Sequence, residues 1–225
     1  MKEFILASRS PRRKALLRNL IESFIIISPD IKEARENGET PDNYVRRISE
    51  LKAQAGRNIV SSSSGKEGVV IAADTIVVDG EMILGKPEDK SHAVQILTEL
   101  RGRTHTVYSG LAVYDTSREE IQTRMVSSKV LMREYTEEEI YAYVASGDPM
   151  DKAGAYAIQN HQFDPAPDFH ECYANVMGLP LCHLAVLLSE MGCPGQIDVA
   201  VRCQETIQYQ CPIFPRILTG IRGKE

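Results

Sequence analysis

An uninterrupted apolar run from Val69 to Ala73, followed at once by Asp74, constrains the fold more than any other feature of the chain. Such a run is typical of a strand buried on both faces, and strands of this kind occur in sheets that helices cover. We therefore expect Asp74 at the carboxyl end of a core strand, where open α/β sheets place their binding sites. A carboxylate in that position needs a metal ion, a water or a cationic side chain to offset its charge. The alternative is an aspartate that only caps a loop.

Strand and helix patterns alternate along the rest of the chain. The predicted strands are residues 4–7, 69–73, 76–78, 81–84, 106–114 and 125–132. The predicted helices are residues 11–20, 41–57, 91–100, 136–147 and 180–191. The pair Asp79-Gly80 predicts a tight hairpin, so the sheet is not all parallel. The fold class expected is α/β with mixed α+β character, a twisted mixed sheet with flanking helices.

Two apolar stretches, residues 24–27 and 184–188, are interpreted as parts of the core. Neither is long enough to cross a bilayer. We also find no secretory signal at the start of the chain and expect a cytoplasmic protein. The domain boundary is placed at residue 192, because proline, glycine, glutamine and cysteine rise and helical periodicity fades over residues 193–225.

The net charge of −5 gives the chain no overall field that would attract nucleic acid. The five cysteines all lie from Cys172 onward, and a disulfide framework is not expected in the cytoplasm. Scattered thiols are favoured over a zinc site that would include His183, because no C-x-x-C pair is present.

The segment from Ser8 to Lys14 predicts a phosphate-binding turn, with a strand before it and a helix beginning at Pro11. Ser10 is a suitable N-cap, and free backbone N–H groups at a helix start bind phosphate. Arg12 and Arg13 can add bidentate contacts, but neighbouring helical side chains diverge. One arginine is therefore free to hold a carboxylate or another substrate group. A capped surface helix with solvated arginines is the alternative, and the acidic chain argues against nucleic-acid binding by this cluster.

Lys86 lies on a tight connection between a strand and a helix, where it is either a phosphate ligand or a solvated lysine. In the segment Asp151 to Gln159, small residues around Gly154 suit a close approach by a ligand or a strand. The Gln159 amide can read the edge of a base, although an irregular strand with a polar end is the simpler interpretation.

Taken in order, these segments resemble the Maf family of nucleotide pyrophosphatases, also called septum-formation inhibitor proteins. The resemblance covers residues 4–190. Its motifs are Leu6-Ala7-Ser8-Arg9-Ser10-Pro11-Arg12-Arg13, Glu33, Lys52-Ala53, Ala73-Asp74-Thr75, Gly85-Lys86-Pro87, Asp151-Lys152-Ala153-Gly154-Ala155-Tyr156-Ala157-Ile158-Gln159 and Gly178-Leu179-Pro180.

The resemblance implies an inosine-triphosphate-pyrophosphatase-like fold with two lobes around a cleft, a homodimer, and a divalent cation, Mg²⁺ or Mn²⁺. It implies hydrolysis of dTTP and UTP between the α- and β-phosphates. The catalytic residues it implies are Asp74, Glu33, Lys52 and Lys86, with Asp74 the proton acceptor and both carboxylates near the metal. The substrate-binding residues it implies are Ser8, Arg12, Arg13, Thr75 and Gln159.

Two other functions stay open from the sequence. The family branch that acts on 7-methyl-GTP carries tryptophan at the place of Arg12 and glutamine at the place of Thr75, which this chain does not. A nucleotide-sensing regulator of septum formation would not need turnover. The rim after Gln159, residues 160–167 and 171–175, departs from the family pattern.

Overall fold

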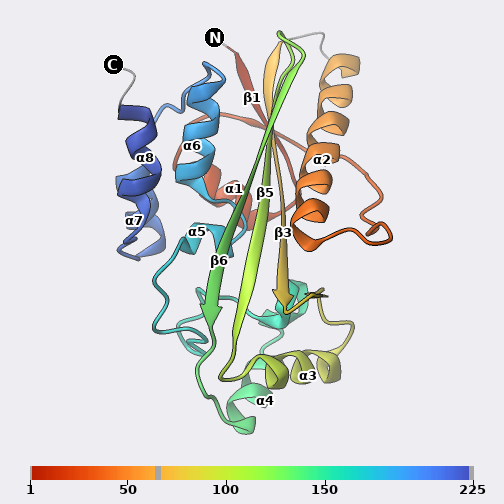
Figure 1. Cartoon of the computed structure of the whole chain (residues 1–225), viewed down its shortest axis with the longest axis vertical. Helices are drawn as coiled ribbons and strands as arrows, with labels where there is room; N and C mark the ends of the chain where they lie inside the picture. Colours follow the sequence, from red (N-terminus) through yellow and green to blue (C-terminus); the bar gives the residue numbers. More distant parts are fainter. Residues whose placement is uncertain (1, 64–66, 223–225) are drawn as a thin grey trace.

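The computed structural model describes residues 2–63 and 67–222, and its described part contains a six-stranded mixed sheet (Figure 1). The strand order is β2-β1-β3-β5-β6, with β4 paired to β3. The strands are β1 (Glu3–Ala7), β2 (Ile25–Ile27), β3 (Gly68–Asp79), β4 (Met82–Leu84), β5 (Thr104–Asp115) and β6 (Glu120–Leu131). β1 is parallel to β2 and β3, and the other pairings are antiparallel. The predicted mixed α/β fold is confirmed.

Helices cover both faces of this sheet. The α-helices are α1 (Pro11–Leu17), α2 (Pro41–Ser63), α3 (Lys90–Leu100), α4 (Glu137–Ala145), α5 (Tyr173–Val176), α6 (Leu181–Glu190), α7 (Val199–Ile207) and α8 (Phe214–Arg222). Two short 3-10 helices are η1 (Asp148–Asp151) and η2 (Ala153–Ala155). In Figure 1, α2 lies on one side of the long strands, and α6, α7 and α8 lie on the other.

Alternation along β3 explains why helices are needed on both faces. Val69, Ile71 and Ala73 pack in the core that α1 and α6 share, whereas Val70 and Ala72 pack under α2. All five side chains are fully buried. A separate core is built from α3, α4 and the segment 155–169, and it forms a second lobe beside the far ends of β3 and β5.

β3 corrects the predicted position of Asp74. The two predicted strands 69–73 and 76–78 are one twelve-residue strand, so Asp74 lies in its middle and not at its carboxyl end. The physical reason is β5, which pairs with β3 without interruption from Val69 to Val78. A long antiparallel partner carries the strand past the point where the apolar run ends.

One further expectation was wrong in part. Residues 24–27 were expected in the core, but Ile25 and Ile26 are 45% and 40% exposed because β2 is the edge strand of the sheet. The extension 193–225, over which helical periodicity fades in the sequence, contains α7 and α8. Asp198 caps α7 by accepting from the amides of Ala200 and Val201.

Local signals elsewhere were confirmed. Thr136 and Glu139 form the predicted capping box of α4, and Gly147 ends that segment with a φ of 80°. Leu184 and Leu188 are buried in the core. Among the described residues, no helix has both the length and the apolar character needed to span a bilayer.

Candidate functional site

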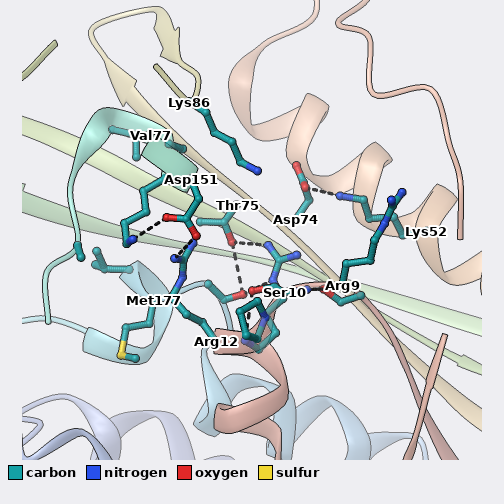
Figure 2. A pocket seen from close by; sticks show the side chains of 18 of the residues that line it. Arg9, Ser10, Arg12, Lys52, Asp74, Thr75, Val77, Lys86, Asp151 and Met177 are labelled. Carbon is teal, nitrogen blue, oxygen red and sulfur yellow. Dashed lines mark hydrogen bonds and ion pairs between the residues drawn. The ribbon is translucent and has the colours of Figure 1, made fainter. Parts of the chain in front are cut away.

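A cleft of about 400 Å³ brings the predicted site residues together (Figure 2). The nine residues expected from the sequence all line it: Ser8, Arg12, Arg13, Glu33, Lys52, Asp74, Thr75, Lys86 and Gln159. Its walls come from the β1–α1 turn, the middle of β3, the segment 151–159 and the residues before α6. The cleft therefore lies where the two lobes meet.

The middle of β3 is open toward this cleft. β1 pairs with β3 only as far as Ile71, and β4 pairs with it only from Val77 onward. Between these points the edge of β3 has no partner strand in the described residues. Asp74 and Thr75 are neighbours on this open stretch, and successive side chains of a strand point to opposite faces. One strand thus presents an acid to one side of the cleft and a hydroxyl to the other.

Lys52 of α2 joins the two carboxylates. Its Nζ lies 2.7 Å from Oδ1 of Asp74 and 2.9 Å from Oε1 of Glu33. The Lys52 and Asp74 side chains are 13% and 10% exposed, whereas Glu33 is half exposed. The Lys52 ammonium is the cation that the buried carboxylate of Asp74 was expected to need. The same two acids are also placed to share a bound cation.

The turn before α1 is built by side-chain hydrogen bonds, and the predicted N-cap is confirmed. The Ser10 side chain accepts from the amide of Arg13 at 3.4 Å. The Ser8 hydroxyl accepts from the amide of Ser10 at 3.2 Å and is almost fully buried. These bonds hold the turn at the floor of the cleft.

Arg13 is held by neutral oxygen atoms. Its Nε donates to the carbonyl of Gly178 at 2.8 Å, and its Nη2 donates to the Thr75 hydroxyl at 3.0 Å. The Thr75 hydroxyl also lies 2.8 Å from that of Ser109. Burial lowers the pKa of Arg13, and the nearby Asp74 acts in the opposite direction. The guanidinium keeps its charge, because the ordinary pKa of arginine is far above neutral pH.

The two arginines diverge as expected. Arg12 lies 3.6 Å from the Asp151 carboxylate (Figure 2), whereas Arg13 contacts Gly178 and Thr75. Asp151 in turn accepts from Lys152 at 2.6 Å. Burial is the largest single influence on the pKa of Asp151 and acts to raise it, but the hydrogen bond from Lys152 and the charges of Lys152 and Arg12 together lower that pKa below its ordinary value. The sequence motif gives Asp151 and Lys152 no individual role, because the contact between Asp151 and Arg12 joins residues far apart in the chain.

The segment that carries Gln159 is seated against β3. Gly154 has a φ of 72°, and a Cβ there would meet Val77 at 3.0 Å, so the predicted close approach to a strand is confirmed. The amide of Gly154 donates to the carbonyl of Gly85 at 3.1 Å. That bond joins the Gln159 segment to the connection that carries Lys86. The Lys86 side chain extends toward the cleft in Figure 2.

The cysteines lie away from this site and are free thiols. Four of them line one small apolar hollow beside α7: Cys172, Cys182, Cys203 and Cys211. In residues 2–63 and 67–222, no three histidine, cysteine, aspartate or glutamate side chains form a group that could hold a metal ion.

Comparison with known proteins agrees with the motifs. The family model described as Maf-like protein matches residues 3–191. A dTTP/UTP pyrophosphatase of Clostridium tetani is 42% identical over 191 residues, which is 84% of this chain and 97% of that relative. A dTTP/UTP pyrophosphatase of Dictyoglomus thermophilum is 43% identical over 194 residues, 85% of this chain and 97% of that relative. One of Geotalea uraniireducens, with the same name, is 42% identical over 188 residues, 84% of this chain and 94% of the relative. The chain belongs to the family of Maf-like proteins.

Proposed function

We propose that this chain is a nucleoside-triphosphate pyrophosphatase that hydrolyses dTTP and UTP to the monophosphate and pyrophosphate. One observation carries the proposal: the Asp74 carboxylate and the Arg13 guanidinium flank one cleft, with Lys52 and Lys86 on its walls. The relatives that share 42–43% of their residues with this chain carry the name of this activity.

The triphosphate is bound by the cations and hydroxyls of the cleft. Lys52 and Lys86 act as point charges, and the Ser8 turn supplies a hydroxyl at the cleft floor. Two of the Arg13 donors are engaged by protein oxygens, so its remaining N–H groups are aimed in a fixed direction. A preorganised cation of this kind stabilises developing negative charge without having to reorient.

A divalent cation, Mg²⁺ or Mn²⁺, fits the acids of the site. Magnesium is commonly held by one or two carboxylates together with substrate phosphates, and Asp74 and Glu33 supply two carboxylates around one cationic position. When bound with the nucleotide, the cation neutralises part of the phosphate charge.

Asp74 is the proton acceptor in the proposed reaction. A water molecule attacks the α-phosphorus, and its proton passes to the Asp74 carboxylate. The bond from the α-phosphorus to the bridging oxygen breaks, and pyrophosphate leaves with that oxygen. In the structure Lys52 donates to Oδ1 of Asp74 at 2.7 Å, which leaves Oδ2 free of that contact.

Arg12, Thr75 and Gln159 are the proposed specificity residues. The Gln159 amide offers one donor and one acceptor, which match the adjacent O4 and N3–H groups of uracil and thymine. Cytosine reverses part of that pattern, so a fixed amide disfavours it. Thr75 contributes by orienting Arg13, because its hydroxyl already accepts from that side chain.

Product analysis tests the proposal directly. The full chain is incubated with UTP, dTTP, CTP or 7-methyl-GTP, with Mg²⁺, with Mn²⁺, or with EDTA. We expect monophosphate and pyrophosphate from UTP and dTTP, and no turnover in EDTA. Preferred cleavage of 7-methyl-GTP would show that the chain is a 7-methyl-GTP pyrophosphatase instead. Binding of nucleotide without any product would favour a regulatory protein instead.

We also propose that the enzyme works in the cytoplasm as a homodimer, as its family resemblance implies. Sedimentation velocity of the full chain checks the dimer, which predicts about twice the 25.1 kDa mass of the chain.

A further inference from the structure

The last two helices lie outside the residues that the family model matches, which end at 191. α7 and α8 are nevertheless part of the packed structure, beside α6 in Figure 1. Val199 and Cys203 are buried in the first core, and the Thr206 hydroxyl donates to Oδ1 of Asn19 at 2.6 Å. α7 is therefore joined to the turn that follows α1, the helix that carries Arg12 and Arg13.

Tyr209, just after α7, reaches the other lobe. The apolar residues of α7 and α8 pack on the first core, but Tyr209 packs on the second. Its ring lies 5.0 Å from that of Tyr173, with 32° between the planes. Its hydroxyl donates to the carbonyl of Phe169 at 3.0 Å, and the Phe169 ring completes a cluster of three aromatic rings.

This cluster is connected to the base-reading end of the cleft. The Tyr173 hydroxyl donates to the carbonyl of Ile158 at 2.8 Å, and Ile158 directly precedes Gln159. In addition, residues 206–208 line a surface hollow together with Gln159 and His161. Met177 lines both this hollow and the main cleft. The end of α7 is thus an immediate neighbour of the segment that presents the amide.

We propose that Tyr209 is a positioning residue for substrate specificity: it holds Tyr173, which through the Ile158 carbonyl fixes the orientation of Gln159. The inference rests on the proposed function, since it assigns the base-reading role to Gln159. A side chain from beyond the family-matched region then determines how strictly the cleft separates uracil from cytosine. Tyr209 touches no substrate, and the phosphate chemistry does not depend on it.

The test compares Tyr209→Ala with Tyr209→Phe in the full chain. The alanine variant removes the ring and the hydroxyl, so we expect the ratio of kcat/KM for UTP to that for CTP to fall about fivefold, mostly through a higher KM for UTP. The phenylalanine variant keeps the ring against Tyr173 and should stay within about twofold of the unchanged chain. Val201→Ala is the matched control, because Val201 is a half-exposed residue of the same helix.

Hydrogen exchange provides a readout that needs no turnover. We expect faster exchange over residues 158–163 in Tyr209→Ala than in the unchanged chain or in Val201→Ala. An unchanged UTP-to-CTP ratio, or an equal loss for both nucleotides together with unchanged exchange, would overturn the inference. If the unchanged chain cleaves neither nucleotide, the proposed function fails, and the exchange data alone still test whether Tyr209 holds the Gln159 segment. If Tyr209→Ala does not fold, Tyr209→Leu, which fills much of the space of the ring, takes its place.

Discussion

Two regions of the cleft hold their charged groups in different ways. At one, Glu33, Lys52 and Asp74 are held by one another, and half of the Glu33 side chain is exposed. At the other, Arg13 is held by the carbonyl of Gly178 and the hydroxyl of Thr75, both of them neutral. Ion pairs exchange partners when a new ion arrives, whereas hydrogen bonds to fixed neutral groups do not. This contrast is consistent with the proposed roles, in which the first region accepts a metal ion and a water and the second holds one cation in a constant direction.

The largest expected effect comes from Asp74→Asn. The amide cannot accept the proton of the attacking water, so we expect kcat to fall by about 10³-fold while the chain still folds. Turnover of UTP and a thermal melt measure the two quantities. Asp79→Asn is the control, because Asp79 lies on the same strand, pairs with Arg103 and does not line the cleft. Equal activity of both variants would remove Asp74 from the mechanism.

Arg13→Lys tests whether the second region depends on direction and not only on charge. A lysine keeps the positive charge but cannot reproduce the planar fork that reaches both Gly178 and Thr75. We expect kcat/KM for UTP to fall about 100-fold. Lys14→Arg, a change of the same kind at the adjacent residue of α1, is the control. Near-normal activity of Arg13→Lys would show that a point charge is sufficient.

Thr75→Val is expected to have a smaller effect of the same kind. Valine fills the same space but leaves Nη2 of Arg13 without its acceptor, at a cost of about 1 kcal/mol. This cost corresponds to a decrease of about fivefold to tenfold in kcat/KM for UTP. Steady-state kinetics measures this change. The Arg13→Lys, Thr75→Val double variant should lose little more than Arg13→Lys alone, and an additive loss would contradict a shared role.

The smallest effect on activity is expected from a substitution of His105, a buried residue of β5. His105 lies 2.8 Å from the hydroxyl of the cleft residue Tyr156, and burial lowers the pKa of His105 to about 4. The unfolded chain therefore binds a proton near pH 6.5, and the folded chain does so only near pH 4. The folded chain is therefore stabilised, relative to acid conditions, by the neutral His105 above pH 6.5, and this part of the free energy of unfolding is lost as the pH falls toward 4.

Denaturant unfolding of the unchanged chain and of His105→Gln across this pH window measures the contribution. We expect the dependence on pH to be shallower in the variant, with turnover at pH 8 nearly unchanged. His183, whose pKa burial also lowers to about 4, leaves part of the slope in place. An identical slope in both proteins would show that His105 does not titrate as described.

The sequence was most informative where a local pattern determines a local structure. The Ser10 cap, the Thr136 capping box and the Asp79-Gly80 turn depend on neighbours within a few residues, and each lies where it was predicted. The site residues were assembled by family resemblance, and all nine line one cleft. What the pattern did not reveal depends on distant partners. β5 extends β3 through Asp74, and the Arg12–Asp151 pair joins residues 139 positions apart, since 151 − 12 = 139.

The stretch of β3 between Ile71 and Val77, which in the described residues has β5 on one edge and no strand on the other, limits where residues can be inserted or deleted. Inserting or deleting one residue there would turn the acid toward α1 and the hydroxyl toward α2, since each step along a strand reverses the facing of its side chains. In surface loops such as the one before α2, side chains do not alternate between two faces, so a change of one residue does not reverse them. We therefore expect natural and laboratory variants to accept indels in the surface loops of this chain, and to lose activity when a single residue is inserted or deleted between Ile71 and Val77 of β3.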